Sequence, residues 1–369
     1  MRSSPEALPR GVVILLGGAS AVVVVAGVRG VADLVGPVFL ALMLAVTASP
    51  LTAWLRRRGT PAWLATAGTL IAVYLVLFGI GGALVVSVAR LADLMPSYQA
   101  QFADLRNDLV NDLSRLGISV DQLRHALAGI DPHSVVRFVQ SLAGSVANTL
   151  SGTIFLLTVL FFMCLDTAYF PARLGRVRAQ RPQVVEALSA FAHGTRRYLL
   201  VSTVFGLVVA IIDTLVLWAL GIPLPVLWGL LSFITNYIPN VGFVIGVIPP
   251  ALLGLLQGGP RLLLWVVVLY CGVNFVVQSV IQPKIVGNAV GLSATVSFLS
   301  LIFWGWVFGA LGALLAIPLT LLAKSLLIDV DPTTRWLNDL LAGGSPGDTT
   351  TTTGAAGEPA PHPEGADHA

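Results

Sequence analysis

The chain has 369 residues, of which 56% are hydrophobic and only 11% are charged. Soluble domains carry about 25% charged residues, so this composition excludes a soluble globular protein and indicates a polytopic, all-α membrane protein. The net charge of +3 does not indicate a nucleic-acid partner, because the basic residues flank apolar runs: three are Arg56, Arg57 and Arg58, and 6 of the 21 Lys and Arg residues lie between Arg173 and Arg197.

Apolar runs, taken in chain order, predict six full membrane spans. A bilayer core of about 30 Å needs about 20 helical residues. Runs of about this length cover residues 11–28, 34–54, 62–88, 148–166, 198–220 and 261–282. The first run has no evident small-residue cleavage site, so we interpret it as an uncleaved first helix and not as a secretory signal.

The arginines predict the orientation of these spans. Residues 56–58 and the basic loop 167–197 are expected in the cytoplasm, which places both chain termini there and residues 89–147 outside. The sequence therefore predicts a multi-pass protein of the cell membrane, with N- and C-termini in the cytoplasm.

The external segment 89–147 has an amphipathic helical pattern. Its apolar residues recur at spacings of three and four: Tyr98, Phe102, Leu105, Leu109, Leu113 and Leu116. We expect this helical segment to pack on itself, on the membrane or on a neighbouring subunit in a homo-oligomer; the alternative is a solvated helical cap with no ligand. The tail from Ala342 to Ala369 lacks apolar periodicity and is expected to be disordered.

Two further apolar stretches do not fit single spans. Residues 224–257 and 293–327 are each too long for one helix and carry Gly or Pro near the middle, while their halves of about 14–18 residues are short for crossing. We predict two broken or re-entrant helical hairpins, giving about eight membrane segments; the alternative is a pair of long, kinked spans. Glycines four apart are expected to allow close helix approach; these pairs are Gly242/Gly246, Gly254/Gly258 and Gly305/Gly309.

Signatures of enzyme chemistry are absent from the sequence. It has no GxxxxGK[ST] phosphate loop, no GxSxG nucleophile elbow, and no His, Cys or carboxylate cluster with metal spacing. We therefore expect no enzyme activity, no cofactor and no metal.

Polar residues inside the spans are the remaining candidates for function. Asp213 lies near the middle of its predicted helix, where a carboxylate costs about 2.5–3.5 kcal/mol on insertion scales. It is interpreted either as a proton- or cation-coupling group or as a hydrogen-bonded residue that joins two helices. Asn274, Gln278 and Gln282 follow at intervals of four and form one stripe, which suits a polar pathway or an interhelical ladder.

The stretches "NYIPNVGFVIGVIPPALLGLLQGG" and "QPKIVGNAVGLSATVSFLSLIFWGWVFGALGALLAIPLTLL" resemble the signature of the AI-2E family, the autoinducer-2 exporter-like permeases of bacteria. The resemblance covers about Gly11 to Leu327 and is most specific over residues 198–327. It implicates these positions: Ile238, Pro239, Gly242, Gln282, Pro283, Gly287, Gly309, Gly312 and Pro318. Family sequences often carry an acidic residue before the QP proline, where this chain has Gln282, so a coupling carboxylate at that position is in doubt.

The resemblance implies export of a small polar solute such as autoinducer-2, by a secondary or facilitated mechanism. The alternatives are a Na⁺(Li⁺)/H⁺ antiporter, which some relatives are described to be, and a non-transporting membrane scaffold. The expected partners are a small polar solute or a monovalent cation or proton, the lipid bilayer and further copies of the chain.

The expected organisation has four parts: N-terminal transmembrane helices (1–88), the external helical segment (89–147), a transport core with broken helices (148–328) and a cytoplasmic, mostly disordered tail (329–369). The two hairpins, each with the span before it, would form two units of opposite orientation, as in many secondary transporters. Their tips are predicted to meet the amide stripe, with Asp213 close by. The predicted pathway residues are Asp213, Asn236, Pro239, Asn240, Gly242, Asn274, Gln278, Gln282, Gly309, Gly312 and Pro318.

Overall fold

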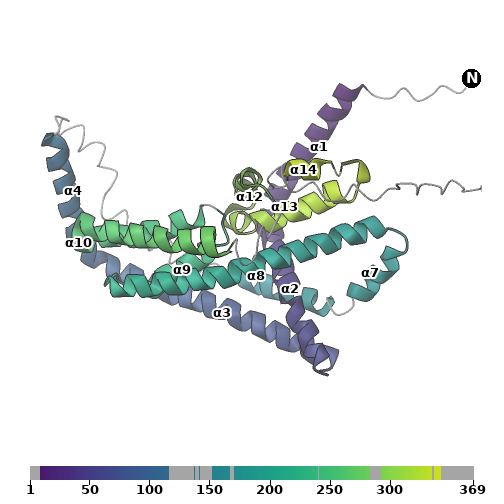
Figure 1. Cartoon of the computed structure of the whole chain (residues 1–369), viewed down its shortest axis with the longest axis horizontal. Coiled ribbons are helices and arrows are strands. Elements are labelled where there is room, and N and C mark those ends of the chain that lie inside the picture. The colour runs from purple at the N-terminus through teal and green to yellow at the C-terminus, as the bar shows by residue number, and fades with distance from the viewer. Residues whose placement is uncertain are drawn as a thin grey trace, which may run out of the picture.

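The computed structural model describes residues 9–115, 137, 141, 152–166, 170–239, 241–282, 292–334 and 336–341. All regular elements in these ranges are helical, which confirms the all-α class (Figure 1). Five of the described helices are long and apolar enough to cross a membrane: Ala32–Arg57, Ala62–Leu105, Pro182–Ala219, Gly242–Ile281 and Ala294–Leu314. Three described apolar helices are shorter: Leu15–Gly30, Gly152–Asp166 and Pro225–Thr235. The count of about eight membrane segments stays a prediction.

The helices have the following bounds. The N-terminal part contains α1 (Arg10–Gly30), α2 (Ala32–Arg57), α3 (Ala62–Leu94), the 3₁₀ turn η1 (Met95–Tyr98) and α4 (Gln99–Arg115). The central part contains α7 (Phe170–Arg178), α8 (Pro182–Ala219), α9 (Pro225–Thr235), α10 (Gly242–Asn274) and the π-helix η2 (Phe275–Ile281). The last part contains α12 (Ala294–Leu314), α13 (Ala316–Lys324), the π-helix η3 (Ser325–Asp329), the 3₁₀ turn η4 (Pro332–Thr334) and α14 (Leu337–Leu341).

The long helix α8 includes part of the segment expected to be a basic loop. It begins at Pro182, because proline is tolerated in the first helical turn, and continues without a break into the predicted span 198–220. Arg196, within this extension, fastens α8 to α2. Pro50 of α2 has no N–H to donate to the carbonyl of Val46, and Arg196 Nε donates to that carbonyl at 3.3 Å. Arg196 also donates to Ser49 Oγ at 2.6 Å.

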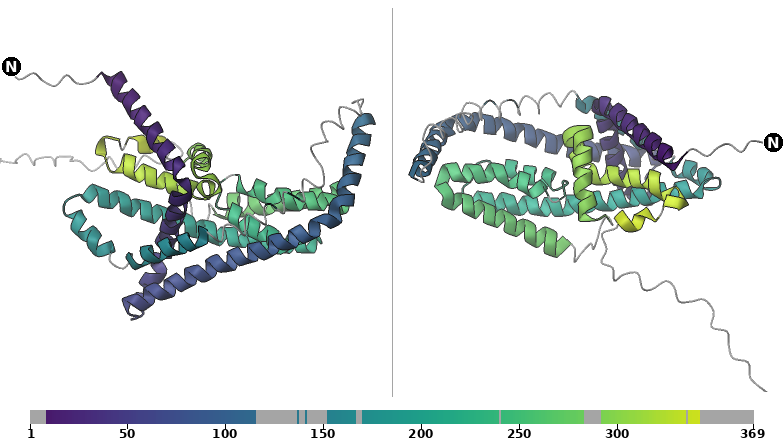
Figure 2. Two further views of the ribbon diagram at one scale, coloured as in Figure 1. Left: turned by 180° about the vertical axis from the view of Figure 1, so that it is seen from behind. Right: turned by 90° about the horizontal axis from the view of Figure 1, so that it is seen from above.

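The described part of the segment 89–147, which was expected to be external, packs on the protein's own core. Figure 2 shows α3 running along one side of the central helices, with α4 turning away at its end. Tyr98 is buried among side chains of α9 and α10, Phe102 and Leu105 pack against the same cluster, and Gln257 Nε2 donates to the Tyr98 hydroxyl at 2.5 Å. Residue 116 of the predicted stripe lies outside the described residues.

Residues 225–257 form a helical hairpin, called here the first hairpin. The chain reverses between Asn236 and Val241, and α10 itself is interrupted at Gly258 and Gly259, whose backbone angles are not helical. A Cβ atom at Gly242 would overlap the carbonyl oxygen of Thr235, so only glycine lets α10 begin this close to the end of α9. The predicted close approach at Gly242 is therefore present, within the hairpin.

Residues 294–324 form the second hairpin. Gly309 interrupts α12 with a φ of 63°, which is a left-handed conformation favoured by glycine. The prediction that Gly309 allows close helix approach was wrong, because Gly309 makes the turn and no atom lies within 4 Å of a Cβ placed there. The close approach occurs at Gly312, where a Cβ atom would overlap the carbonyl oxygen of Trp304. Trp304 Nε1 donates to Thr320 Oγ1 at 2.9 Å and joins the two legs of the hairpin.

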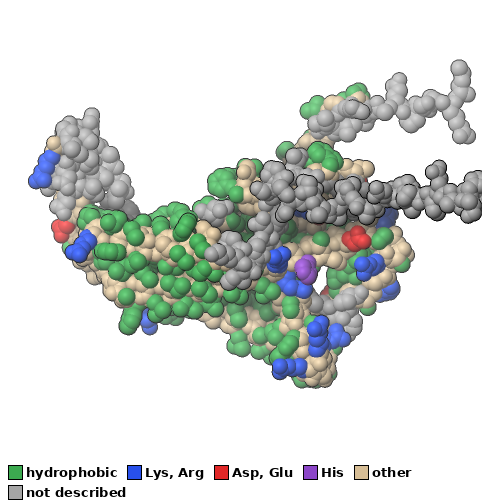
Figure 3. Space-filling model, in the orientation of Figure 1, with side chains coloured by type: hydrophobic (Ala, Val, Ile, Leu, Met, Phe, Trp, Pro, Cys, Tyr) green, Lys and Arg blue, Asp and Glu red, His purple; other side chains and the backbone are tan. Residues whose placement is uncertain are grey.

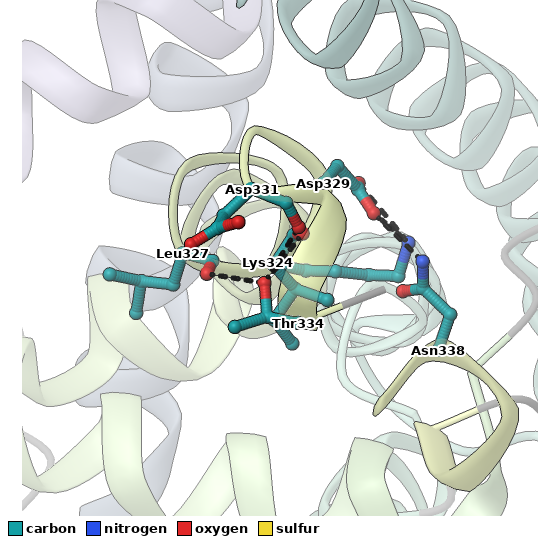
Figure 4. A network of polar contacts seen from close by, with 7 residues as sticks. Lys324, Leu327, Asp329, Asp331, Thr334 and Asn338 are labelled. Atoms are coloured by element: carbon teal, nitrogen blue, oxygen red, sulfur yellow. Dashed lines mark hydrogen bonds and ion pairs between the residues drawn. The ribbon is translucent and has the colours of Figure 1, made fainter. Parts of the chain in front are cut away.

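The chain after the second hairpin folds back on itself (Figure 4). Lys324 Nζ contacts both carboxylate oxygens of Asp329, at 3.1 and 3.2 Å, and Asn338 Nδ2 donates to the same carboxylate at 3.1 Å. The backbone N–H of Ser293 donates to the carbonyl of Leu341 at 3.0 Å. These bonds connect both ends of the second hairpin to the segment 329–341. Residues 342–369, expected to be disordered, lie outside the described residues.

The surface matches a membrane environment. Figure 3 shows hydrophobic side chains over the face that α9 and α10 present, while Lys and Arg gather toward the ends of α2 and α7. Large apolar side chains that are more than half exposed include Val204, Ile211 and Leu215 on α8 and Ile248 and Leu264 on α10. Such exposure is unusual in water and is expected where lipid covers the helices.

Candidate functional site

The candidate site lies where α8, α9 and the second half of α10 meet. Small residues allow the first two helices to pack closely. A Cβ atom at Gly229 of α9 would touch the Ala210 carbonyl oxygen of α8 at 2.9 Å. This close packing brings Ser232 of α9 directly against Asp213.

Asp213 is fully buried, with 0% of its surface exposed. Ser232 Oγ of α9 donates to its Oδ2 at 2.7 Å, and Ser232 Oγ also lies 3.2 Å from the hydroxyl of Tyr270 in α10. Because a serine hydroxyl carries one hydrogen, Tyr270 supplies the hydrogen of the second bond when Ser232 donates to Asp213. The other carboxylate oxygen, Oδ1, is buried and has no hydrogen-bond partner among the described residues.

Amide side chains continue from this point toward the tip of the first hairpin. Asn274 Nδ2 donates to the Tyr270 carbonyl at 3.0 Å, and Gln278 Nε2 donates to Asn274 Oδ1 at 2.8 Å. Gln278 Nε2 also donates to Asn236 Oδ1 at 3.1 Å, and Asn236 Nδ2 donates to the Ser202 carbonyl at 3.0 Å. These six residues, called here the polar chain, are Asp213, Ser232, Tyr270, Asn274, Gln278 and Asn236.

A π-helix carries one member of the polar chain. Gln278 lies within η2, which begins directly after Asn274. π-helical turns are rare, occur frequently at functional sites and leave the usual backbone hydrogen-bond pattern. The wider turn still brings the Gln278 and Asn274 amides together, so the predicted stripe is present over these two residues.

The structure brings together some of the predicted site residues. Asp213, Asn236, Asn274 and Gln278 belong to the polar chain, and Gly242 and Pro239 lie at the adjoining hairpin tip. Gln282 directly follows η2 and lies beyond Gln278, the last residue of this helix that belongs to the polar chain. The remaining predicted residues lie elsewhere: Gly309, Gly312 and Pro318 are in the second hairpin, while Asn240, Pro283 and Gly287 lie outside the described residues.

Sequence reasoning missed Ser232, Tyr270 and Ser202. Ser232 and Tyr270 are almost fully buried, at 5% and 0% exposure, and both stand in otherwise apolar helical runs. A serine or tyrosine in such a run is a weak signal, because serine satisfies itself locally and tyrosine packs as a large apolar ring. Their importance follows only from their contacts with Asp213.

The chemistry of this arrangement suits binding and passage. The polar chain offers amide and hydroxyl donors and acceptors together with one carboxylate, and no group of three or more possible metal-ligating side chains occurs among the described residues. A buried carboxylate oxygen without a hydrogen-bond partner is costly unless a proton, a cation or a polar molecule binds to it.

Comparisons with known proteins agree with the fold. The family model described as AI-2E family transporter matches residues 13–330. The chain is 33% identical to the AI-2 transport protein TqsA of Escherichia coli, over 85% of this chain and 90% of TqsA. It is 30% identical to YhhT of Escherichia coli, over 87% of this chain and 92% of YhhT. It is also 30% identical to a transport protein of Haemophilus influenzae, over 84% of this chain and 90% of that protein.

Proposed function

The chain belongs to the AI-2E transporter family, and from this premise we propose that it carries a small polar solute across the bacterial cell membrane along the polar chain. One observation carries the proposal: a fully buried carboxylate with two hydroxyls beside it lies next to a hydrogen-bonded set of three amides, inside helices whose outer faces are apolar, and Tyr270 joins the two groups, through its hydroxyl to Ser232 and through its backbone carbonyl to Asn274. Polar side chains inside a membrane bundle are costly, and this cost is justified where they line a path for solutes or ions.

The similarity to TqsA selects the first solute to test. TqsA is an AI-2 transport protein and covers most of this chain. The amides of Asn236, Asn274 and Gln278 offer hydrogen-bond donors and acceptors to a small polar solute of this kind.

A coupled mechanism is the second candidate, and Asp213 favours it. The carboxylate accepts a hydrogen bond from the neutral Ser232 hydroxyl, which is in turn bonded to the neutral Tyr270 hydroxyl. Its other oxygen, Oδ1, has no partner among the described residues. A proton or a monovalent cation at Oδ1 would remove the cost of this buried charge. Movement of this ion together with the solute would couple solute flux to the proton or sodium gradient, whereas exchange of a proton for a sodium ion at Oδ1 would constitute antiport.

We propose further that both hairpins are re-entrant and enter the membrane from opposite sides. For the first hairpin, a Cβ atom at Gly254 would lie 3.5 Å from Ile222 Cδ1, so the two ends of the hairpin lie side by side. For the second, the bonds of Ser293 and Lys324 connect both ends to the segment 329–341. Broken helices at matching positions are the usual plan of inverted-repeat transporters, in which the exposed backbone groups face a solute path.

The proposed organisation keeps the four parts predicted from the sequence. Residues 1–88 are the N-terminal transmembrane helices, 89–147 the extracytoplasmic helical segment, 148–328 the transport core and 329–369 the cytoplasmic tail, with both termini in the cytoplasm. Copies of the chain are expected to associate through the external segment.

The test uses the purified full chain in proteoliposomes with a pH-sensitive dye inside and either autoinducer-2 or Na⁺ outside. Autoinducer-2 uptake that Gln278→Ala lowers supports the proposed pathway. Gln257→Ala is the matched control, because Gln257 is a glutamine of α10, the helix that η2 directly follows, but it bonds to Tyr98, away from the polar chain.

The other outcomes separate the alternatives. Proton flux driven by Na⁺ without autoinducer-2 uptake supports antiport. Absence of both fluxes refutes the proposed substrate and coupling, and favours a scaffold role.

A further inference from the structure

The tip of the first hairpin is held by side chains of α8. Within the tip, the N–H of Ile238 donates to the Thr235 carbonyl at 2.8 Å, and the N–H of Gly242 donates to the Ile238 carbonyl at 3.0 Å. The carbonyl of Tyr237 is satisfied from a different helix: the Tyr198 hydroxyl donates to it at 2.8 Å. Since lipid offers no hydrogen-bond donors, this bond fixes the tip at one position on α8.

The side chain of Tyr237 makes a second connection to α8. Its hydroxyl lies 2.7 Å from Thr203 Oγ1, and Thr203 Oγ1 donates to the Leu199 carbonyl at 2.6 Å. Because threonine has one hydroxyl hydrogen, Tyr237 is the donor to Thr203. Phe233 packs edge-on against the Tyr237 ring, with ring centroids 5.7 Å apart.

Tyr198 shares a buried apolar cluster with residues of the second hairpin. It is buried in one apolar cluster with Leu315 and Ile317, and Tyr237, Trp304 and Phe308 pack against the same cluster. Tyr198 therefore bonds to the tip of one hairpin and lies in the apolar cluster that includes residues of the other.

We propose that Tyr198 is a positioning residue that couples the two hairpins. By holding the Tyr237 carbonyl, it fixes the neighbouring Asn236 opposite Gln278, where the two amides are joined at 3.1 Å. A movement of the second hairpin is transmitted through the Tyr198 ring to the tip of the first and thus to the polar chain. This inference rests on the proposed pathway for its role in transport, while the contact itself is tested separately.

The test is Tyr198→Phe, which keeps the ring in the cluster and removes only the hydroxyl. The variant Ile238→Cys reports on the tip, in a background with Cys164 and Cys271 replaced by Ala. We expect a water-soluble thiol reagent to label residue 238 about three- to tenfold faster in the Tyr198→Phe variant, because one hydrogen bond no longer holds the tip.

Tyr74→Phe is the matched control. It also removes a tyrosine hydroxyl that donates to a backbone carbonyl between helices, that of Leu157 at 2.6 Å, away from both hairpins. Unchanged labelling in the Tyr198→Phe variant overturns the inference, and so does an equal rise in both variants, which would indicate general loosening.

Transport is measured on the same proteins with autoinducer-2 as the probe. If the tip is freed, we expect a several-fold fall in uptake at unchanged protein abundance. If the wild-type protein carries no autoinducer-2, the proposed substrate fails, while the labelling still decides whether Tyr198 positions the tip.

Discussion

Replacement of Gly242 by alanine is expected to destabilise the first hairpin. The added Cβ atom would overlap the carbonyl oxygen of Thr235. This oxygen is part of the backbone and also accepts the bond from the Ile238 N–H, so it cannot move aside without opening the turn. Forced overpacking costs about 1–3 kcal/mol, so we expect the free energy of unfolding to fall by about that amount.

Two other glycines provide a graded series. At Gly246 the nearest atoms to a new Cβ are Thr235 Oγ1 at 3.3 Å and Ser232 Oγ at 3.5 Å, which are side-chain atoms that can adjust, so a smaller loss is expected. At Gly79, inside α3, nothing lies within 4 Å. Alanine there should stabilise the helix by about 0.5–1 kcal/mol, because glycine is a poor helix former.

The assay is reversible unfolding in mixed micelles by titration with a denaturing detergent, followed by tryptophan fluorescence. The variants Gly242→Ala and Gly79→Ala should differ by about 1.5–4 kcal/mol, which is the sum of the two effects. Equal stability of these two variants would refute the hairpin packing described for Gly242, since a kinked span without this reversal would leave the position open.

Three further predictions concern the polar chain and the hairpin. Ser232→Ala should lower the free energy of unfolding by about 1–3 kcal/mol, because it leaves the Asp213 carboxylate without its hydrogen-bond donor. The loss should be smaller in an Asp213→Asn background, and additive losses in a double-mutant cycle would contradict this. Asp213→Asn should shift or abolish the pH dependence of transport in proteoliposomes, and an unchanged pH profile would leave Asp213 a structural residue. Cysteines introduced at Leu224 and Gln257 should both react with an impermeant reagent from outside the cell, whereas reactivity from opposite faces would exclude a re-entrant first hairpin.

Composition and local pattern were sufficient to predict an all-helical membrane protein and the positions at which two apolar segments are interrupted. Apolar runs indicated an all-helical membrane protein. The predicted spans 34–54 and 62–88 lie within α2 and α3, and the predicted span 198–220 lies within α8 except for its last residue. The interruptions at 236–241 and at Gly309 were also readable, because proline and glycine act on the backbone at their own positions. The resemblance to the AI-2E family, based on the motifs in these same stretches, is confirmed by the family match over residues 13–330.

The partners of the polar side chains were decided only by the tertiary structure. The sequence placed Asp213 inside a helix but could not show that Ser232 would meet it, because the two residues lie on different helices whose rotation depends on packing at Gly229. The regular spacing of Asn274, Gln278 and Gln282 suggested one uniform stripe, yet the chain of bonds leaves this helix at Gln278 and passes to Asn236. Helix formation depends on neighbours in sequence, whereas a buried polar group is satisfied by whichever helix packs against it, and this choice is made by the shape of the whole bundle.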